Sequence, residues 1–206
     1  MVRRLSLGLV GAGEVAQLIH LPILHQLTDR FDVVSLYDPS PSVVSAVASH
    51  WAIPRTHTDL HSFLSDKTLD AVMILSPDQY HATHARAALA AGYHVFLEKP
   101  ACLTEGGFAL LQKDVESSDK ISMVGYMRCY APAFKKAQAL LPEFKKIRHV
   151  RVRDVICEGP WFFSNWAEVA VPNGDIPVEL LETGRQARRD AILSVCGEDA
   201  PASLQR

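Results

Sequence analysis

Residues 5–16 read LSLGLVGAGEVA, an apolar strand pattern that runs into a glycine turn and then into the start of a helix. In such a turn Gly11 permits the tight reversal and Gly13 lets the backbone approach a pyrophosphate. The small Ala16 allows the helix to pack closely on the strand. The stretch therefore predicts the phosphate-binding turn of a dinucleotide-binding α/β fold.

The context of the turn strengthens this interpretation, because a glycine motif alone is weak. The first helical turn, at Glu14 and Val15, directs free N–H groups towards the phosphates. A second apolar strand, 33–37, ends in Asp38, 25 residues after Gly13. A carboxylate there accepts hydrogen bonds from the adenosine ribose diol and repels a 2′-phosphate, so NAD is favoured over NADP. The alternative is a glycine-rich turn in an α/β domain that binds nothing.

Composition narrows the class of protein. The 206 residues carry a formal net charge of −2, which gives no electrostatic reason to expect binding to nucleic acid or to an anionic membrane. No apolar run reaches the roughly 18 residues of a membrane helix. The cysteines are widely spaced and suit free thiols in a reducing compartment, so we expect a cytoplasmic protein. They are Cys102, Cys129, Cys157 and Cys196.

Apolar runs alternate with helical patterns from the turn to about residue 126, which predicts an α/β fold with a Rossmann-type, doubly wound parallel sheet. Continuous apolar runs such as 70–75 are typical of strands covered on both faces. Pro22 is expected to kink or interrupt the first helix, which spans 14–27. Four later helices have a candidate N-cap residue before them. These caps are Ser40, Asp59, Asp78 and Thr104.

The pattern changes after about residue 130. We therefore expect a nucleotide-binding domain over 1–130 and a partial substrate or oligomerisation domain over 131–206. Residues 148–153 alternate valine and positively charged side chains, which predicts a strand with one solvent-exposed face. Residues 178–196 have the pattern of an amphipathic helix. One strand and one helix cannot bury their own apolar faces, so this α+β domain is expected to be incomplete or completed by another chain.

Ligands of a doubly wound sheet bind at the carboxyl ends of its strands. Several predicted strands end in residues that can carry chemistry there. These are Gly11, Gly13, Asp38, Ser76, Pro77, His81, Glu98, Lys99, Pro100 and Arg128. His81 and His84 have a spacing that could suit a metal, but no third ligand is nearby, and we predict no metal site.

The residues at these strand ends resemble a known family. PDQYH at 77–81 and HVFLEKP at 94–100 are similar to the signature of the Gfo/Idh/MocA oxidoreductases, the relatives of glucose–fructose oxidoreductase and inositol dehydrogenase. VGYMRCYAPAF at 124–134 is similar to the segment in which that family leaves its nucleotide domain. Together with the glycine turn, the resemblance covers about three-quarters of the chain.

The resemblance implies roles for individual residues. Lys99 would hydrogen-bond the substrate oxygen while a hydride moves to the nicotinamide, and Glu98 would position the cofactor. Pro100 would follow a cis peptide that shapes the nicotinamide pocket, and His81 would help to position groups beside the cleft. Arg128 could hold a substrate carboxylate or hydroxyl, or form a salt bridge instead. The implied activity is NAD(P)-dependent oxidation or reduction of a sugar, a polyol or a related secondary alcohol or ketone.

One expected part is missing. The family takes its general acid/base from a Gly-x-His-x-x-Asp segment of the second domain, whereas this chain has no histidine after His149, and Asn173-Gly174-Asp175 lacks one. Two alternatives therefore stay open beside the dehydrogenase. The chain could be a catalytically impaired cofactor-binding regulator or scaffold, or a shortened product of a longer dehydrogenase.

Overall fold

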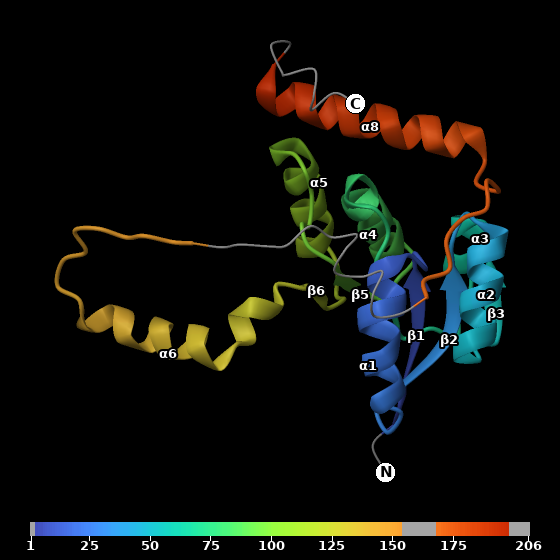
Figure 1. Ribbon diagram of the computed structural model, residues 1–206, viewed down its shortest axis with the longest axis horizontal. Coiled ribbons are helices and arrows are strands. Elements are labelled where there is room, and N and C mark those ends of the chain that lie inside the picture. The colour runs from blue at the N-terminus through green and yellow to red at the C-terminus, as the bar shows by residue number, and fades with distance from the viewer. Residues whose placement is uncertain (1–2, 154–167, 198–206) are drawn as a thin grey trace. The chain divides into compact units, whose positions relative to one another are not determined.

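The computed structural model describes residues 3–153 and 168–197 (Figure 1). Two compact units are present: one combines the residues up to Val124 with those from Val169 onward, and the other runs from Gly125 to Glu168. The predicted second domain comprises all residues from 131 to 206. The division differs because the segment after Glu168 returns to the first unit, where Ala170 packs against the core.

The first unit is built on a six-stranded sheet with the order β3-β2-β1-β4-β5-β6. Every neighbouring pair of strands is parallel, which confirms the predicted Rossmann-type, doubly wound sheet. Because the strands are parallel, their carboxyl ends all meet at one edge. The strands are β1 (Leu5–Val10), β2 (Phe31–Tyr37), β3 (Arg55–His57), β4 (Ala71–Ile74), β5 (His94–Leu97) and β6 (Ser122–Val124).

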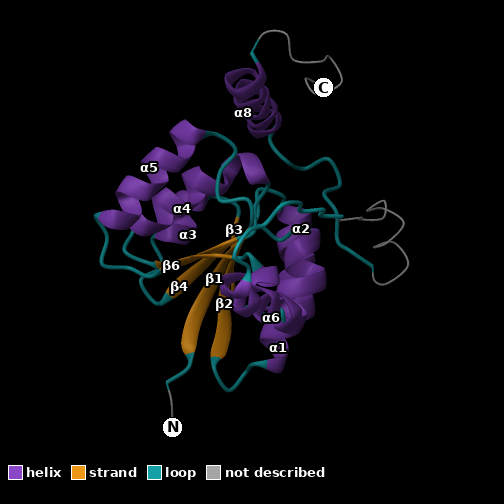
Figure 2. Cartoon of the chain, turned by 90° about the vertical axis from the view of Figure 1, so that its left-hand side faces the viewer, coloured by secondary structure: helices purple, strands orange, loops and turns teal. Residues whose placement is uncertain are grey.

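Helices cover both faces of this sheet (Figure 2). One face carries α1 (Leu21–Gln26) and α2 (Pro41–Trp51), and the other carries α3 (Leu60–Leu64), α4 (His81–Ala90) and α5 (Glu105–Glu116). Each face has its own apolar core. Burial on both faces explains why the central strands are continuous apolar runs.

Three of the four predicted helix caps are confirmed. The side chains of Ser40, Asp59 and Thr104 each accept a hydrogen bond from a backbone N–H in the first turn of the next helix. The prediction for Asp78 is wrong. Asp78 is the first residue of the short 3₁₀ helix η2 (Asp78–Tyr80), and the capping position belongs to Pro77, which has no side-chain acceptor.

The first helix is continuous, with an unusual turn where an interruption was expected. Residues 14–26 are helical, and η1 (Ala16–His20) within them is a π-helix that leads directly into α1. Pro22 directly follows this π-helical turn and would lack an N–H inside a regular α-helix. The wider turn accommodates the missing donor, so the helix continues through the proline.

The described part of the second unit is helical. It contains η3 (Met127–Tyr130), α6 (Pro132–Leu140) and η4 (Leu141–Glu143). The predicted strand over 148–153 is wrong, since these residues form no strand, and Val150 and Val152 are 67% and 84% exposed. An alternating pattern forms a strand only when another strand pairs with it, and no described segment does so. Residues 161–166 read WFFSNW, an aromatic cluster that lies outside the described residues.

The last described element is α8 (Val178–Cys196), which matches the predicted amphipathic helix and belongs to the first unit. None of the helices within 3–153 and 168–197 combines the length and the apolar character needed to cross a bilayer.

Candidate functional site

The glycine turn follows β1 at the carboxyl edge of the sheet. Gly11 has a φ of +102°, and a Cβ atom there would lie 2.8 Å from backbone atoms of Leu75 and Ser76. Only glycine fits this position, because both the torsion angle and the space exclude a side chain. A Cβ atom on Gly13 would meet nothing within 4 Å. The glycine at that position is therefore not required by packing within the described chain.

Asp38 follows the end of β2 and hydrogen-bonds to the glycine turn. Its carboxylate accepts hydrogen bonds from the N–H of Ala12 at 2.9 Å and from the N–H of Ser40 at 3.0 Å. Burial raises the pKa of the Asp38 carboxyl, and the two backbone N–H groups oppose that effect. The carboxylate predicted for the adenosine ribose thus lies directly against the turn predicted for the pyrophosphate.

Glu98 and Lys99 follow β5 at the same edge. One Glu98 carboxylate oxygen lies 2.9 Å from the Nε2 atom of His20, and the other accepts the N–H of Lys99 at 3.0 Å. Both oxygens of Glu98 are therefore engaged away from the Lys99 ammonium. Within the described part of the chain, that exposed ammonium has no hydrogen-bond or ion-pair partner.

Two histidines hold the loop after β4. His81 is buried, with its ring nitrogens 2.7 Å from the carbonyl oxygen of Ser76 and 2.6 Å from that of Pro100. The ring thereby joins the loops after β4 and β5. His84 lies with Nδ1 2.9 Å from the Ser76 hydroxyl and stacks on the ring of Tyr80. Burial first, and then the charge of His81, lower the pKa of His84 to about 4.

The remaining predicted residues lie as follows. Glu14 and Val15 form the exposed first helical turn after Gly13, and Pro77 is exposed after Ser76. The Lys99–Pro100 peptide is cis, as the resemblance implied. Arg128 lies in η3, which belongs to the other compact unit.

The residues at this edge fit a dinucleotide. The open space in front of Gly13 matches the close approach that a pyrophosphate makes to such a turn. Asp38 supplies the acceptor for a ribose diol at the adjoining strand. The turn and its carboxylate are therefore arranged for the group that the sequence predicted.

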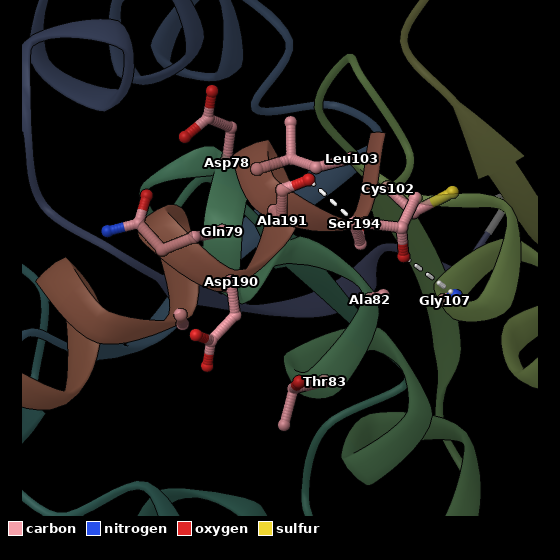
Figure 3. A pocket seen from close by; sticks show the side chains of 12 residues that line it. Asp78, Gln79, Ala82, Thr83, Cys102, Leu103, Gly107, Asp190, Ala191 and Ser194 are labelled. Carbon is pink, nitrogen blue, oxygen red and sulfur yellow. Dashed lines mark hydrogen bonds between the residues drawn. The ribbon is translucent and has the colours of Figure 1, made fainter. Parts of the chain in front are cut away.

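A separate pocket of about 360 Å³ lies between α8 and the residues that begin η2, α4 and α5. Figure 3 shows its two carboxylates, Asp78 and Asp190, extending away from each other. None of the predicted site residues lines it. The lining residues are Asp78, Gln79, Ala82, Thr83, Cys102, Leu103, Thr104, Gly107, Ala187, Asp190, Ala191 and Ser194.

Helix α8 packs against Tyr80 at Gly184, where the helix has no side chain. A Cβ atom on Gly184 would lie 2.5 Å from the hydroxyl oxygen of Tyr80, and that hydroxyl donates to the carbonyl of Leu180 at 3.0 Å. No histidine follows Gly184 on this helix, so the expected Gly-x-His-x-x-Asp pattern does not occur there.

Two residues at this edge, His20 and Gln17, are not among the predicted site residues. His20 pairs with Glu98 across 78 positions of the chain, and Gln17 pairs with Ala170 across 153. A polar residue within the otherwise apolar run LIHLP at 18–22 was the available signal for His20. No sequence signal could identify its partner, because the pairing depends on the order of the strands.

Comparisons with known proteins agree with this geometry. The model of an oxidoreductase family with an NAD-binding Rossmann fold, GFO_IDH_MocA, matches residues 5–126. A protein of Amycolatopsis mediterranei, named as a candidate UDP-kanosamine synthase oxidoreductase subunit, is 34% identical over 158 residues, which cover 74% of this chain and 43% of the relative. An inositol 2-dehydrogenase of Acidothermus cellulolyticus is 31% identical over 140 residues, which cover 68% of this chain and 41% of the relative.

Solved structures show the same fold. Scyllo-inositol dehydrogenase from Lactobacillus casei, crystallised with NAD(H) and scyllo-inositol, superposes with a TM-score of 0.64 at 22% identity, covering 68% of this chain and 42% of that one. An oxidoreductase from Thermotoga maritima gives a TM-score of 0.65 at 27% identity, covering 68% and 44%. The chain spans about two-fifths of the length of the curated relatives it matches.

Proposed function

The chain belongs to the Gfo/Idh/MocA family of oxidoreductases, and we propose that it binds NAD at the carboxyl edge of its sheet and supports hydride transfer to or from a small molecule. The observation that carries this proposal is the contact between the Asp38 carboxylate and the Ala12 N–H, 2.9 Å long. This hydrogen bond joins Asp38, the proposed acceptor for the ribose hydroxyls, to the glycine turn. At Gly13 the turn leaves free space, since a Cβ atom there would meet nothing within 4 Å.

The chain's own residues would bind and orient. The turn from Gly11 to Gly13 would hold the pyrophosphate, and Asp38 would bind the adenosine ribose diol. Ser76 and His81 would form the wall between the two halves of the cofactor. When bound, NAD supplies a nicotinamide carbon that accepts or gives the hydride.

Lys99 is the group that would handle the substrate oxygen. A lysine ammonium next to the reacting carbon can donate a hydrogen bond to a carbonyl or alkoxide oxygen and stabilise the charge that develops there. His20 and the Lys99 N–H keep the Glu98 carboxylate occupied, which leaves the ammonium available to the substrate.

The substrate class that we propose is a secondary alcohol or ketone of a sugar or polyol. Relatives named inositol 2-dehydrogenase, at 31% identity, support a polyol. We further propose a cytoplasmic protein that binds no nucleic acid, in line with its net charge of −2. It would form a homo-oligomer through the predicted second domain, residues 131–206. Arg128 would then contact the substrate.

A second candidate is a regulator or scaffold that binds the cofactor without turning it over. The observation that favours it is that no histidine follows His149 in the sequence, so the expected Gly-x-His-x-x-Asp segment does not occur in it.

The test separates binding from chemistry. We expect NAD to quench or shift the intrinsic fluorescence of the chain, and an inositol or sugar panel to raise the absorbance of reduced nicotinamide. Lys99→Ala should lower that turnover by about 10²-fold or more, with NAD affinity nearly unchanged, while Lys113→Ala on α5 serves as the charge-matched control. NAD binding without turnover of any substrate would favour the regulator, and no binding of NAD or NADP would refute both candidates.

A further inference from the structure

Residues 169–177 return to the carboxyl edge of the sheet from far along the chain. The N–H of Ala170 donates to the Gln17 side chain at 2.8 Å, and the Gln17 amide donates back to the Ala170 carbonyl at 3.0 Å. The same amide donates to the carbonyl of Ala12 at 2.7 Å. The returning segment is thereby fastened to the glycine turn itself.

Five residues further on, the segment places a carboxylate at the start of α2. Asp175 accepts the Ser40 hydroxyl at 2.6 Å with one oxygen and the N–H of Ser42 at 2.7 Å with the other. The hydrogen bond from Ser40 is the main reason that the pKa of Asp175 falls to about 2. Asp175 is therefore ionised, and its charge also lies where the dipole of α2 favours an anion.

Ser40 links this carboxylate to the predicted ribose acceptor. The Ser40 N–H donates to Asp38 at 3.0 Å, while its hydroxyl donates to Asp175. The negative charge of Asp175 opposes ionisation of Asp38 and adds to the effect of burial in raising the pKa of that carboxyl. Two like charges thus flank one serine at the end of β2.

The contacts of Asp175 affect whether NAD or NADP can bind at the end of β2. The 2′-oxygen of the adenosine ribose lies near the acid at the end of β2, and in NADP that oxygen carries a phosphate. A phosphate there needs hydrogen-bond donors, and a helix start is a natural source of them. At α2 those donors, the Ser40 hydroxyl and the Ser42 N–H, are already bound to Asp175.

We propose that Asp175 is a specificity-determining residue: it occupies the donors at the start of α2 and, together with Asp38, excludes the 2′-phosphate of NADP. The proposal rests on the function proposed above. Asp38 alone would repel the phosphate, and Asp175 additionally removes the groups that could have bound it.

The experiment measures binding of NAD and of NADP to the whole chain by fluorescence titration and by isothermal calorimetry. In Asp175→Ala we expect the affinity for NADP to rise roughly tenfold relative to that for NAD, because an anion site at a helix start is vacated. Asp175→Asn, which removes the charge and keeps the shape, should change the ratio in the same direction. Glu179→Gln, an exposed carboxylate four residues away on α8, is the charge-matched control and should leave the ratio unchanged.

The outcomes are distinguishable. A wild-type chain that binds neither dinucleotide overturns the proposed function and this inference with it. NAD binding with a ratio that stays within twofold in both Asp175 variants overturns the inference alone. An equal loss for both dinucleotides also overturns it, because Asp175 would then only fasten the segment. Thermal unfolding of each variant verifies that the fold is kept.

Discussion

The imidazole of His20 and the carboxylate of Glu98 lie 2.9 Å apart, and both side chains are largely buried, at 13% and 17% exposure. The contact joins the π-helical turn of the first helix to the end of β5. It holds the residue next to Lys99 from a different element of the fold. The environment of the lysine therefore depends on the first helix as well as on its own strand.

We predict that His20→Ala lowers the free energy of unfolding by about 1.5–3 kcal/mol, because it leaves a largely buried carboxylate without its side-chain partner. His20→Gln retains an N–H donor and should lose less than about 1 kcal/mol. Denaturant unfolding of the two variants measures the difference. Equal losses in both would show that the ring contributes by packing, against Phe96 among others, and not by its hydrogen bond.

The pair of glycines in the turn gives a second prediction. Gly11→Ala should lower the stability by about 2 kcal/mol or more, since its φ of +102° and the Leu75 backbone 2.8 Å away both oppose a side chain. Gly13→Ala should change it by less than about 1 kcal/mol, because its Cβ atom meets nothing.

Gly13→Ala, which should keep its stability, should nevertheless lose affinity for NAD. The Gly13→Ala methyl group would project into the space in front of the turn and weaken NAD binding roughly tenfold or more. Calorimetric titration of this folded variant checks the expectation. Undiminished affinity in Gly13→Ala would place the pyrophosphate away from the turn.

The partly buried His84 predicts a pH dependence of stability. Its pKa is about 4 in the folded chain against 6.5 for an ordinary histidine, so the unfolded chain takes up the proton first as the pH falls. The stability is then complete above pH 6.5 and decreases as the pH falls from 6.5 to about 4, by up to about 3 kcal/mol. His84→Gln should flatten this part of the curve, and the exposed His50→Gln should not. A slope that persists in His84→Gln would assign the effect to another group.

The docking of α8 gives a double-mutant test. Gly184→Ala should cost about 1–3 kcal/mol, because its Cβ atom would lie 2.5 Å from the Tyr80 hydroxyl. In a Tyr80→Ala background the same substitution should become neutral or stabilising by up to about 1 kcal/mol, since alanine favours a helix over glycine. Thermal unfolding of the four proteins gives the coupling. Additive effects would mean that Gly184 and Tyr80 do not touch in solution.

The core of the fold was predictable because local signals and burial agree there. Strands such as β4 are buried on both faces and read as apolar runs, and caps such as Ser40 and Thr104 act within three residues. The glycine turn and Asp38 were also predictable, because their roles depend on spacing along the chain. Prediction failed at 148–153, where the pattern of a strand is present but no described strand pairs with it.

The candidate site was predictable only in part. Each strand end could be identified from its own residues, but the contacts of His20, Gln17 and Asp175 cross 78, 153 and 135 positions. Such contacts follow from the order of the strands and from the return of 169–177, which no local pattern encodes. Asp175 illustrates this: the sequence showed only an Asn-Gly-Asp turn without a histidine.

The fastening of Ala170 to Gln17 has a consequence for how the protein is made. The last strand of the sheet ends at Val124, so the whole sheet has been synthesised while Ala170 is still to be translated. The nascent chain can therefore order the sheet before the start of α2 receives Asp175, and the proposed adenosine site would be completed by the segment that emerges later. Coenzyme selectivity of the newborn chain would then be acquired in two stages, first from Asp38 and only later from Asp175.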